Sequence, residues 1–402
     1  MRKCPACGAP YNVLDALCPQ CGRELPAPYE GYDGAPAQPE GEALNADAVL
    51  AAIVSDEMPE NTVILSGAEV MLGDTTYPRG SVVIADGKIT EVLNFPITDP
   101  DTSATFVDLS GLLLAAGFVN LCPTLTTGPV SADALTQAAV NATAGGVTTL
   151  LPRLAPRAAE ELAAVLDAFR AALSTPIPGA RLAGLRVETP FRAPALGGLS
   201  LNDPDSQAML ALLFEHKDII RMVTLAPELP GAYDLIHRLR DAGILVSLGG
   251  SEADYDDTLE ALEAGASHVT RLFEQMPPLA PLAPGLVGAA LERDEFYVEF
   301  TCETTVLHPA VISTIISAKG AERALPAAPD GEPLTAVRVL VEEVGWDLGE
   351  ALSMFAATPA LCLDGANFGA IQVAAVADLV ILDQELQPVA TLIGGGTVWQ
   401  RE

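Results

Sequence analysis

Residues 246–276 read VSLGGSEADYDDTLEALEAGASHVTRLFEQM and hold the pattern that decides the fold. An apolar run over 244–248 predicts a strand that stops at two glycines. An acidic amphipathic helix is predicted next, with Leu259 and Leu262 along one side, and a second strand over 267–273. Strand, helix and strand with short links form a βαβ unit. We therefore expect a parallel sheet that presents side chains at the carboxyl ends of its strands.

Composition limits the class of partner. The 402 residues are 50% hydrophobic, enough for a large core, and carry a formal charge of −32 from 53 acidic and 21 basic residues. This surface repels phosphate backbones and anionic lipids, so nucleic-acid and membrane partners are not expected. No apolar run reaches the roughly 18 residues needed to span a bilayer, and the N-terminus has no signal-peptide pattern. We expect a cytoplasmic protein.

Residues 1–26 predict a zinc ribbon. Two C-x-x-C-G knuckles supply its four thiolates, from Cys4, Cys7, Cys18 and Cys21. Four thiolates at this spacing close a tetrahedral structural Zn²⁺ site, and so small a module needs the metal for its stability. A redox dithiol pair is the alternative, although no thioredoxin-like pattern surrounds it. The module resembles ribbons that mediate interactions, so a protein partner is expected there.

Composition changes mark three further regions. Residues 27–60 are rich in acidic residues, Pro, Gly and Ala, and predict a flexible linker. Strand-like segments occupy 61–111 and 370–402, with a hairpin turn at Asp86-Gly87. Between them, residues 112–369 alternate strands with Ala- and Leu-rich helices. The strands are expected near 112–121, 147–151, 181–188, 221–226, 244–248, 266–273 and 296–302.

The strand ends near Gly250 and Arg271 carry a family resemblance. VSLGGSEA ends the first strand of the βαβ unit and TRLFEQM ends the second. They resemble the V-S-x-G-H-S-x-A and T-H-L-[FY]-N-A-M motifs of the amidohydrolase superfamily, most closely of its N-acetylglucosamine-6-phosphate deacetylases. The closing segment ADLVILD at 377–383 and the GGxxV sequence after it are also similar to that family.

The resemblance implies an α/β fold with a (β/α)8 TIM-like barrel over 112–369. A small β-sandwich built from 61–111 and 370–402 flanks it. The family has an eighth strand that ends in its catalytic aspartate. Here the segment 321–333, AERALPAAPDGEP, has three prolines and little β propensity. We therefore expect the eighth strand to be eroded or deleted, and the aspartate lost with it.

The resemblance also locates a degenerate metal site at the carboxyl ends of the barrel strands. Metal-binding histidines of the family fall at Gly250 and Arg271 and, in many members, at Cys122 and Thr124. The family's metal-binding glutamate is retained as Glu188. Glycine has no donor atom and a guanidinium does not bind cations. We expect no catalytic metal in the barrel, and an ion pair of Glu188 with Arg271 or Arg186; a relocated metal is the alternative.

Other positions in this region leave alternatives open. Glu274 and Gln275 stand where the family holds the sugar phosphate, and a carboxylate repels that group. Cys122 and Cys302 follow strands, so a soft-ligand site or a reactive thiol competes with buried apolar cysteines. His268 begins a strand and is expected at the end away from the chemistry. His308 precedes a proline and is expected at a helix start.

The leading interpretation is a deacetylase homologue that has lost metal-dependent activity and serves as a binding or scaffold protein. The barrel mouth could then bind a neutral or cationic small molecule through Glu188, Glu274 and Glu303. The alternative is a divergent active amidohydrolase of the N-acetyl amino sugar deacetylase type with an altered metal site. The resemblance also implies a homodimer formed through the barrel.

Overall fold

The computed structural model describes residues 2–3, 10–11, 62–99, 104–123, 130–328, 332–363, 365 and 367–402. Contacts divide the chain into two units, Met1–Asn45 and Ala46–Glu402. In the first, the short strands β1 (Arg2–Lys3) and β2 (Pro10–Tyr11) pair in antiparallel fashion. The four ribbon cysteines, the linker over 27–60 and Thr124 lie outside the described residues.

The predicted βαβ unit is present. Strands β14 (Leu245–Leu248) and β15 (His268–Val269) pair in parallel around helix α6 (Tyr255–Ala264). A capping box begins α6, because the Asp254 side chain accepts a hydrogen bond from Asp257 N at 2.8 Å while the Asp257 carboxylate accepts one from Asp254 N. The second strand is shorter than predicted. It ends at Val269, and a turn with positive φ at Arg271, Phe273 and Gln275 follows.

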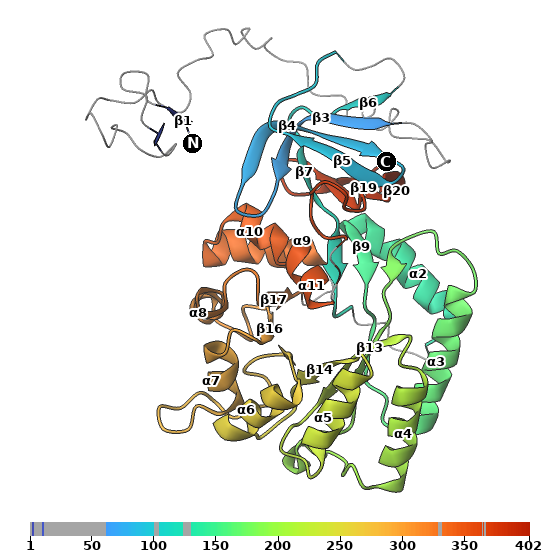
Figure 1. The fold of residues 1–402 in the computed structure, drawn as a ribbon, viewed down its shortest axis with the longest axis vertical. Helices are drawn as coiled ribbons and strands as arrows, with labels where there is room; N and C mark the ends of the chain where they lie inside the picture. The colour runs from blue at the N-terminus through green and yellow to red at the C-terminus, as the bar shows by residue number, and fades with distance from the viewer. Residues whose placement is uncertain are drawn as a thin grey trace. The chain divides into compact units, whose positions relative to one another are not determined.

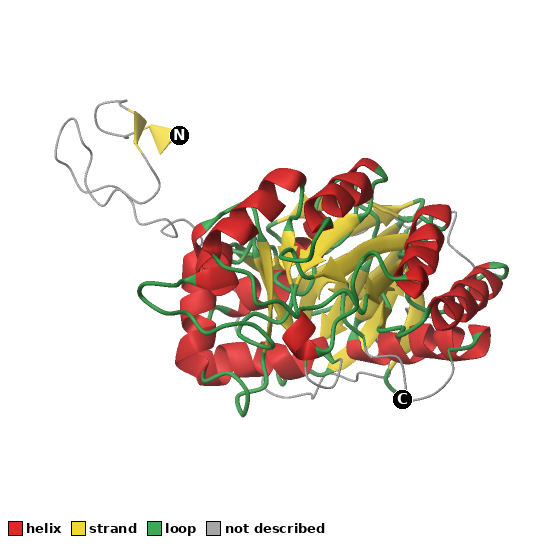
Figure 2. Cartoon of the chain, turned by 90° about the horizontal axis from the view of Figure 1, so that it is seen from below, coloured by secondary structure: helices red, strands yellow, loops and turns green. Residues whose placement is uncertain are grey.

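The barrel strands are parallel, and helices surround them (Figures 1 and 2). One sheet has the order β10-β12-β13-β14-β15-β16-β17, and a second has the order β11-β9-β8. The chain over 147–154 joins them, because β9 pairs with β8 and β11 while β10 pairs with β12. The remaining strands are β8 (Phe118–Asn120), β9 (Val147–Leu150), β10 (Arg153–Leu154), β11 (Arg181–Leu182), β12 (Leu185–Glu188), β13 (Ile220–Leu225), β16 (Tyr297–Thr301) and β17 (Ala324–Ala327).

Helices follow most of these strands along the chain. They are α2 (Ala132–Ala142), α3 (Ala159–Leu173), α4 (Pro204–Glu215), α5 (Ala232–Asp241), α7 (Gly285–Glu292), α8 (Pro309–Lys319), α9 (Pro333–Arg338), α10 (Leu348–Ser353) and α11 (Ala357–Cys362), with short helical segments at Thr143–Gly145, Pro194–Leu196 and Val339–Val344. None of the described helices is long and apolar enough to cross a bilayer.

The eighth strand exists, which corrects the sequence prediction. Strand β17 covers ALPA at 324–327 and pairs in parallel with β16, so that Pro326 lies opposite Phe300. Proline cannot donate a ladder hydrogen bond, which argues against a strand interior but not against an edge. In the sheet order β17 is the terminal strand, with β16 as its ladder partner. The edge position explains why the strand tolerates the proline.

Both chain ends build the flanking β region, for which the resemblance implied a β-sandwich. Its eight strands form one hydrogen-bonded sheet, in which β18 pairs antiparallel with β7 and the Asp86-Gly87 turn joins β4 to β5. The predicted strand over 112–121 is divided at Gly117, because β7 belongs to this sheet and β8 to the barrel. The strands are β3 (Val63–Met71), β4 (Thr76–Ala85), β5 (Lys88–Leu93), β6 (Thr105–Asp108), β7 (Leu113–Ala116), β18 (Leu379–Leu382), β19 (Pro388–Ile393) and β20 (Gly396–Gln400).

Candidate functional site

The carboxyl end of β12 carries Glu188, the acid that the resemblance matches to a metal-binding glutamate, and two arginines contact it. Arg153 Nη1 lies 3.1 and 3.2 Å from its two carboxylate oxygens, and Arg271 Nη2 lies 3.0 Å from Oε2. The Glu188 side chain is 14% exposed, so these contacts replace much of its hydration. The expected pairing with Arg271 is present. Arg153, the first residue of β10, is a partner that the sequence analysis missed.

Arg186 lies one layer deeper than Glu188 and does not pair with it. Side chains two apart on a strand share a face, so both point into the barrel. Arg186 is fully buried and forms an ion pair with Glu299 on β16. Its Nη2 also donates to Thr270 Oγ1 at 2.6 Å, and Thr270 Oγ1 donates to Glu299 Oε1 at 2.7 Å. The lone acid in the strand sequence YVEFT was the available signal for Glu299.

His268 lies beside this ion pair, which corrects its predicted place away from the site. Its side chain is fully buried; Nδ1 shares a 2.8 Å hydrogen bond with Ser247 Oγ, and Nε2 lies 3.8 Å from Glu299 Oε2. Burial and the Arg186 charge lower the pKa of His268 to about 3. Burial opposes ionisation of Glu299, but Arg186 outweighs it and keeps the pKa of Glu299 below its ordinary value. The buried cluster therefore holds a guanidinium, a carboxylate and a neutral imidazole.

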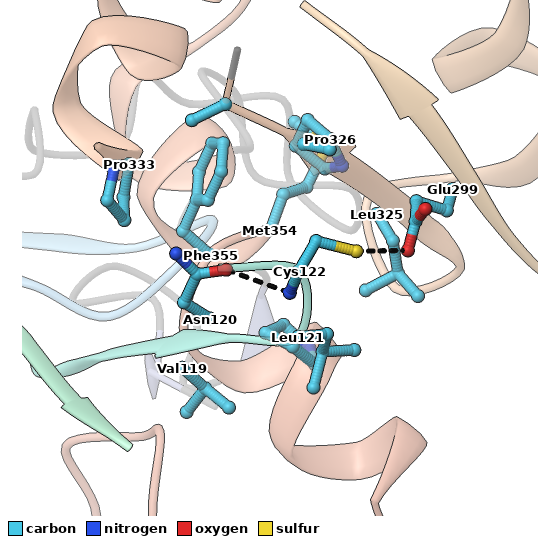
Figure 3. Close-up of a pocket in the computed structure, with 13 residues that line it drawn as sticks. Val119, Asn120, Leu121, Cys122, Glu299, Leu325, Pro326, Pro333, Met354 and Phe355 are labelled. Atoms are coloured by element: carbon cyan, nitrogen blue, oxygen red, sulfur yellow. Dashed lines mark hydrogen bonds between the residues drawn. The ribbon is translucent and has the colours of Figure 1, made fainter. Parts of the chain in front are cut away.

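Cys122 joins the same cluster from the end of β8. Its Sγ donates to Glu299 Oε2 at 2.8 Å, and its backbone N–H donates to Asn120 Oδ1 at 2.9 Å (Figure 3). Arg186 Nη1 lies 2.7 Å from the same sulfur. Burial raises the pKa of Cys122 and of Cys302, which favours the protonated thiol. At Cys122 the Arg186 charge opposes this effect, but burial and Glu299 outweigh it, so the environment of both sulfurs favours the protonated thiol over a reactive thiolate.

The barrel mouth contains a cavity of about 40 Å³. The Arg192 side chain packs closely against Gly250, because a Cβ on Gly250 would lie 2.8 Å from Arg192 Cδ. Gly250 also has φ of +59°. Arg192 Nη1 donates to Gln275 Oε1 at 3.5 Å. The lining residues are Glu188, Thr189, Arg192, Thr224, Gly249, Gly250, Thr270, Arg271, Glu274 and Gln275.

These residues do not fit a catalytic metal. Glu188 is engaged by two guanidinium groups, Gly250 has no side-chain donor, and Arg271 is itself a cation. Within the described ranges, no group of three or more His, Cys, Asp or Glu side chains is arranged to hold an ion. The end of β17, where the resemblance implies the catalytic aspartate, carries Ala327 and Ala328.

Two further predictions concern side chains near the mouth. His308 is the N-cap of α8, and its ring nitrogen accepts a hydrogen bond from Ala310 N at 3.1 Å, as expected for a helix start. Glu303, expected to contact a ligand, accepts a 2.8 Å hydrogen bond from Thr305 Oγ1. Neither residue lines the cavity of the barrel mouth.

Comparison with known proteins finds relatives among the deacetylases that the strand-end motifs resemble. N-acetylgalactosamine-6-phosphate deacetylase from Shewanella sp. (strain ANA-3) is 26% identical over 393 residues, which cover 85% of this chain and 97% of the relative. Human N-acetylglucosamine-6-phosphate deacetylase is 28% identical over 73% of this chain and 85% of its own. The chain is homologous to these deacetylases. No model of a protein family matches the sequence.

A solved structure places the deacetylase homologue in the same fold. N-acetylglucosamine-6-phosphate deacetylase from Pasteurella multocida superposes with a TM-score of 0.75, at 24% identity, over 85% of this chain and all of that one. At this identity the likeness establishes the fold alone. The barrel and its flanking sheet are therefore common to both proteins, and the site must be interpreted from the residues of this chain.

Proposed function

We propose that this deacetylase homologue has lost metal-dependent deacetylation and serves as a binding or scaffold protein. The observation that carries the proposal is the double ion pair of Glu188 with Arg153 and Arg271. A hydrolytic metal site needs several neutral or anionic donors and an open position for water. Here the Glu188 carboxylate is neutralised by protein cations, and the ligand positions that the resemblance places at Gly250 and Arg271 offer no metal donor.

Among the described residues, which break off after Ala328, the end of β17 carries no acid, and this supports the same proposal. A metal-activated water needs a group that takes up its proton and delivers it to the leaving amine. Ala327 and Ala328 occupy the strand end where the family resemblance implies that group. The corrected position of the eighth strand therefore leaves the expected loss of the general base unchanged.

The ribbon cysteines complete the proposal. Cys4, Cys7, Cys18 and Cys21 would hold one structural zinc and present a small module to a protein partner. The barrel domain would then act as a folded binding domain attached to that module. No step of this proposed role uses a metal in the barrel.

Metal content and acetate release test the proposal on the full chain. After loading with Zn²⁺, we expect about one zinc per chain and no acetate release from N-acetylglucosamine 6-phosphate. Replacing Cys4 and Cys7 with serine should lower the zinc content to near zero. Zinc that remains in this variant, or acetate release by either protein, would favour a divergent active amidohydrolase instead.

A further inference from the structure

We propose that the barrel mouth binds the carboxylate group of a small monoanionic ligand between Arg192 and Arg271. This inference rests on the proposed function, because a metal on Glu188 would require Arg271 to leave. It concerns the cavity of about 40 Å³ that both arginines line. Parallel barrels bind ligands at this end of their strands.

The local charge favours an anion although the chain as a whole is acidic. The charged side chains that line the cavity, or form an ion pair with one that lines it, are Arg153, Arg192, Arg271, Glu188 and Glu274. Arg186 and Glu299 both hydrogen-bond to the lining residue Thr270, and their opposite charges cancel. Three positive charges against two negative charges leave an excess of one positive charge, in a protein of formal charge −32. Burial raises the pKa of Glu274, which weakens the negative side further. This local excess of positive charge at the cavity favours the binding of one anionic group.

The geometry of the two guanidinium groups suits a carboxylate. Arg271 contacts Glu188 through Nη2, and the polar contact of Arg192 is a 3.5 Å hydrogen bond to Gln275 Oε1, at the limit of such interactions. A guanidinium has five N–H donors in a planar fork that matches the two oxygens of a carboxylate. Both side chains thus retain donor capacity toward the cavity that they share.

Gly250 is part of the same arrangement. A Cβ at this position would lie 2.8 Å from Arg192 Cδ and 3.0 Å from its Cγ, so the missing side chain makes room for the arginine. A volume of about 40 Å³ is a few times the roughly 10–15 Å³ that one water needs, so it accepts a group as small as a carboxylate. The rest of the ligand would extend through the open mouth.

The same residues disfavour other ligand charges. A cation would need Glu188, whose two oxygens are already within 3.2 Å of guanidinium nitrogens. A phosphate dianion would bring two negative charges to a site with one net positive charge, with Glu274 lining the same cavity. The single negative charge of a monocarboxylate matches the one net positive charge of the site.

Three sugars that differ at one carbon test the charge class. D-glucuronate, D-glucose and D-glucose 6-phosphate carry a carboxylate, a hydroxyl and a phosphate at carbon 6. Isothermal titration of the full chain at pH 7 and low salt should show glucuronate binding about tenfold or more tightly than either other sugar. Glucose binding as tightly as glucuronate, tighter binding of glucose 6-phosphate, or no heat from glucuronate would overturn the inference.

Matched variants locate the binding. Arg192→Gln and Arg271→Gln should each weaken glucuronate affinity about tenfold or more. Arg79→Gln removes the same charge from an exposed position on β4 and should leave the affinity unchanged. Arg192→Gln breaks one long hydrogen bond, so this variant is expected to keep the thermal midpoint of the parent protein. An unchanged affinity in Arg192→Gln would place the ligand elsewhere.

The two proposals fail in different ways. Zinc content is measured on the same protein sample before titration. More than one zinc per chain would refute the loss of the metal site, whatever the sugars do. About one zinc per chain together with no preference for glucuronate would refute the carboxylate site alone.

Discussion

Glu188 and Glu299 both lie inside the barrel and both form ion pairs with arginine. The two groups differ in how far water reaches them. The Arg153 and Arg271 side chains that hold Glu188 are 22% and 37% exposed, so water screens part of that interaction. Arg186 is fully buried against Glu299, whose side chain is 4% exposed. Loss of one partner from the deeper pair should therefore cost more folding free energy than loss of one partner from the outer group.

Removal of the Glu299 charge tests this difference. Glu299→Gln leaves Arg186 buried without a counter-ion, and we expect a loss of about 3–5 kcal/mol in the free energy of unfolding. Urea denaturation at pH 7 measures it. Arg186→Met with Glu299→Leu should be less destabilised than the sum of the single variants, since no buried charge remains. Arg170→Met, which removes an exposed ion pair with Asp218, is the control and should change stability little.

His268 predicts a pH dependence of stability. Its folded pKa of about 3 lies below the ordinary 6.5, so the unfolded chain binds a proton that the folded chain excludes as the pH falls below about 6.5. Stability should fall by up to about 1.4 kcal/mol per pH unit between pH 6 and 5, before Glu299 contributes near pH 4.5 and below.

Urea midpoints at pH 7.5, 6 and 5 measure this slope. His268→Gln should reduce it, and His237→Gln, on the exposed side of α5, should retain it. Equal slopes in the two variants would mean that His268 does not control the titration. A general loss of stability in His268→Gln does not affect this comparison, because the test uses the change of stability with pH and not the absolute urea midpoint.

Gly250 tests whether one donor can restore the metal site. Gly250→His combines a positive φ with a Cβ 2.8 Å from Arg192 Cδ, so we expect a loss of about 1–3 kcal/mol in stability and no additional zinc. Gly197→His, also at positive φ but with no atom within 4 Å of its Cβ, isolates the backbone strain. Urea denaturation measures both losses. An equal loss in the two variants would mean that contact with Arg192 adds nothing to the cost of Gly250→His.

At the level of elements, Gly117 is the joint where one extended segment passes from the flanking sheet into the barrel. A Cβ there would lie 2.3 Å from Thr148 Cγ2 and 2.6 Å from its Oγ1, so β8 and β9 approach more closely than a side chain allows. Thr148 is buried, with 1% of its surface exposed. Glycine at this joint is therefore a packing requirement.

Gly117→Ala should destabilise the barrel by about 1–3 kcal/mol, because the added methyl overpacks the contact with Thr148. Thermal or urea unfolding measures the loss. The double variant Gly117→Ala with Thr148→Ala should recover part of it. Gly145→Ala, where a Cβ would meet no atom within 4 Å, is the control. If the double variant recovers no stability, the loss in Gly117→Ala comes from backbone geometry and not from the contact with Thr148.

At the scale of the whole molecule, local pattern predicted most of the barrel and both halves of the flanking sheet. The βαβ unit around α6 follows from an apolar run, a capping box and a terminal glycine, all of which act within a few residues. β17 was mispredicted because the cost of Pro326 depends on its place in the sheet. Edge position is a property of the assembled sheet and has no local signal.

The sequence by itself determined the resemblance, the acid at the position that the resemblance assigns to a metal-binding glutamate, and the lack of metal donors at Gly250 and Arg271, because each is a residue identity at a strand end. Only the tertiary structure decided which charged side chains form ion pairs with each other. Arg153 reaches Glu188 across 35 residues, and Arg186 reaches Glu299 across 113. It also placed His268 beside the buried ion pair and Arg192 against Gly250. Such contacts arise when strands far apart in the chain direct side chains into one interior, and hydrophobic periodicity contains no information about those pairings.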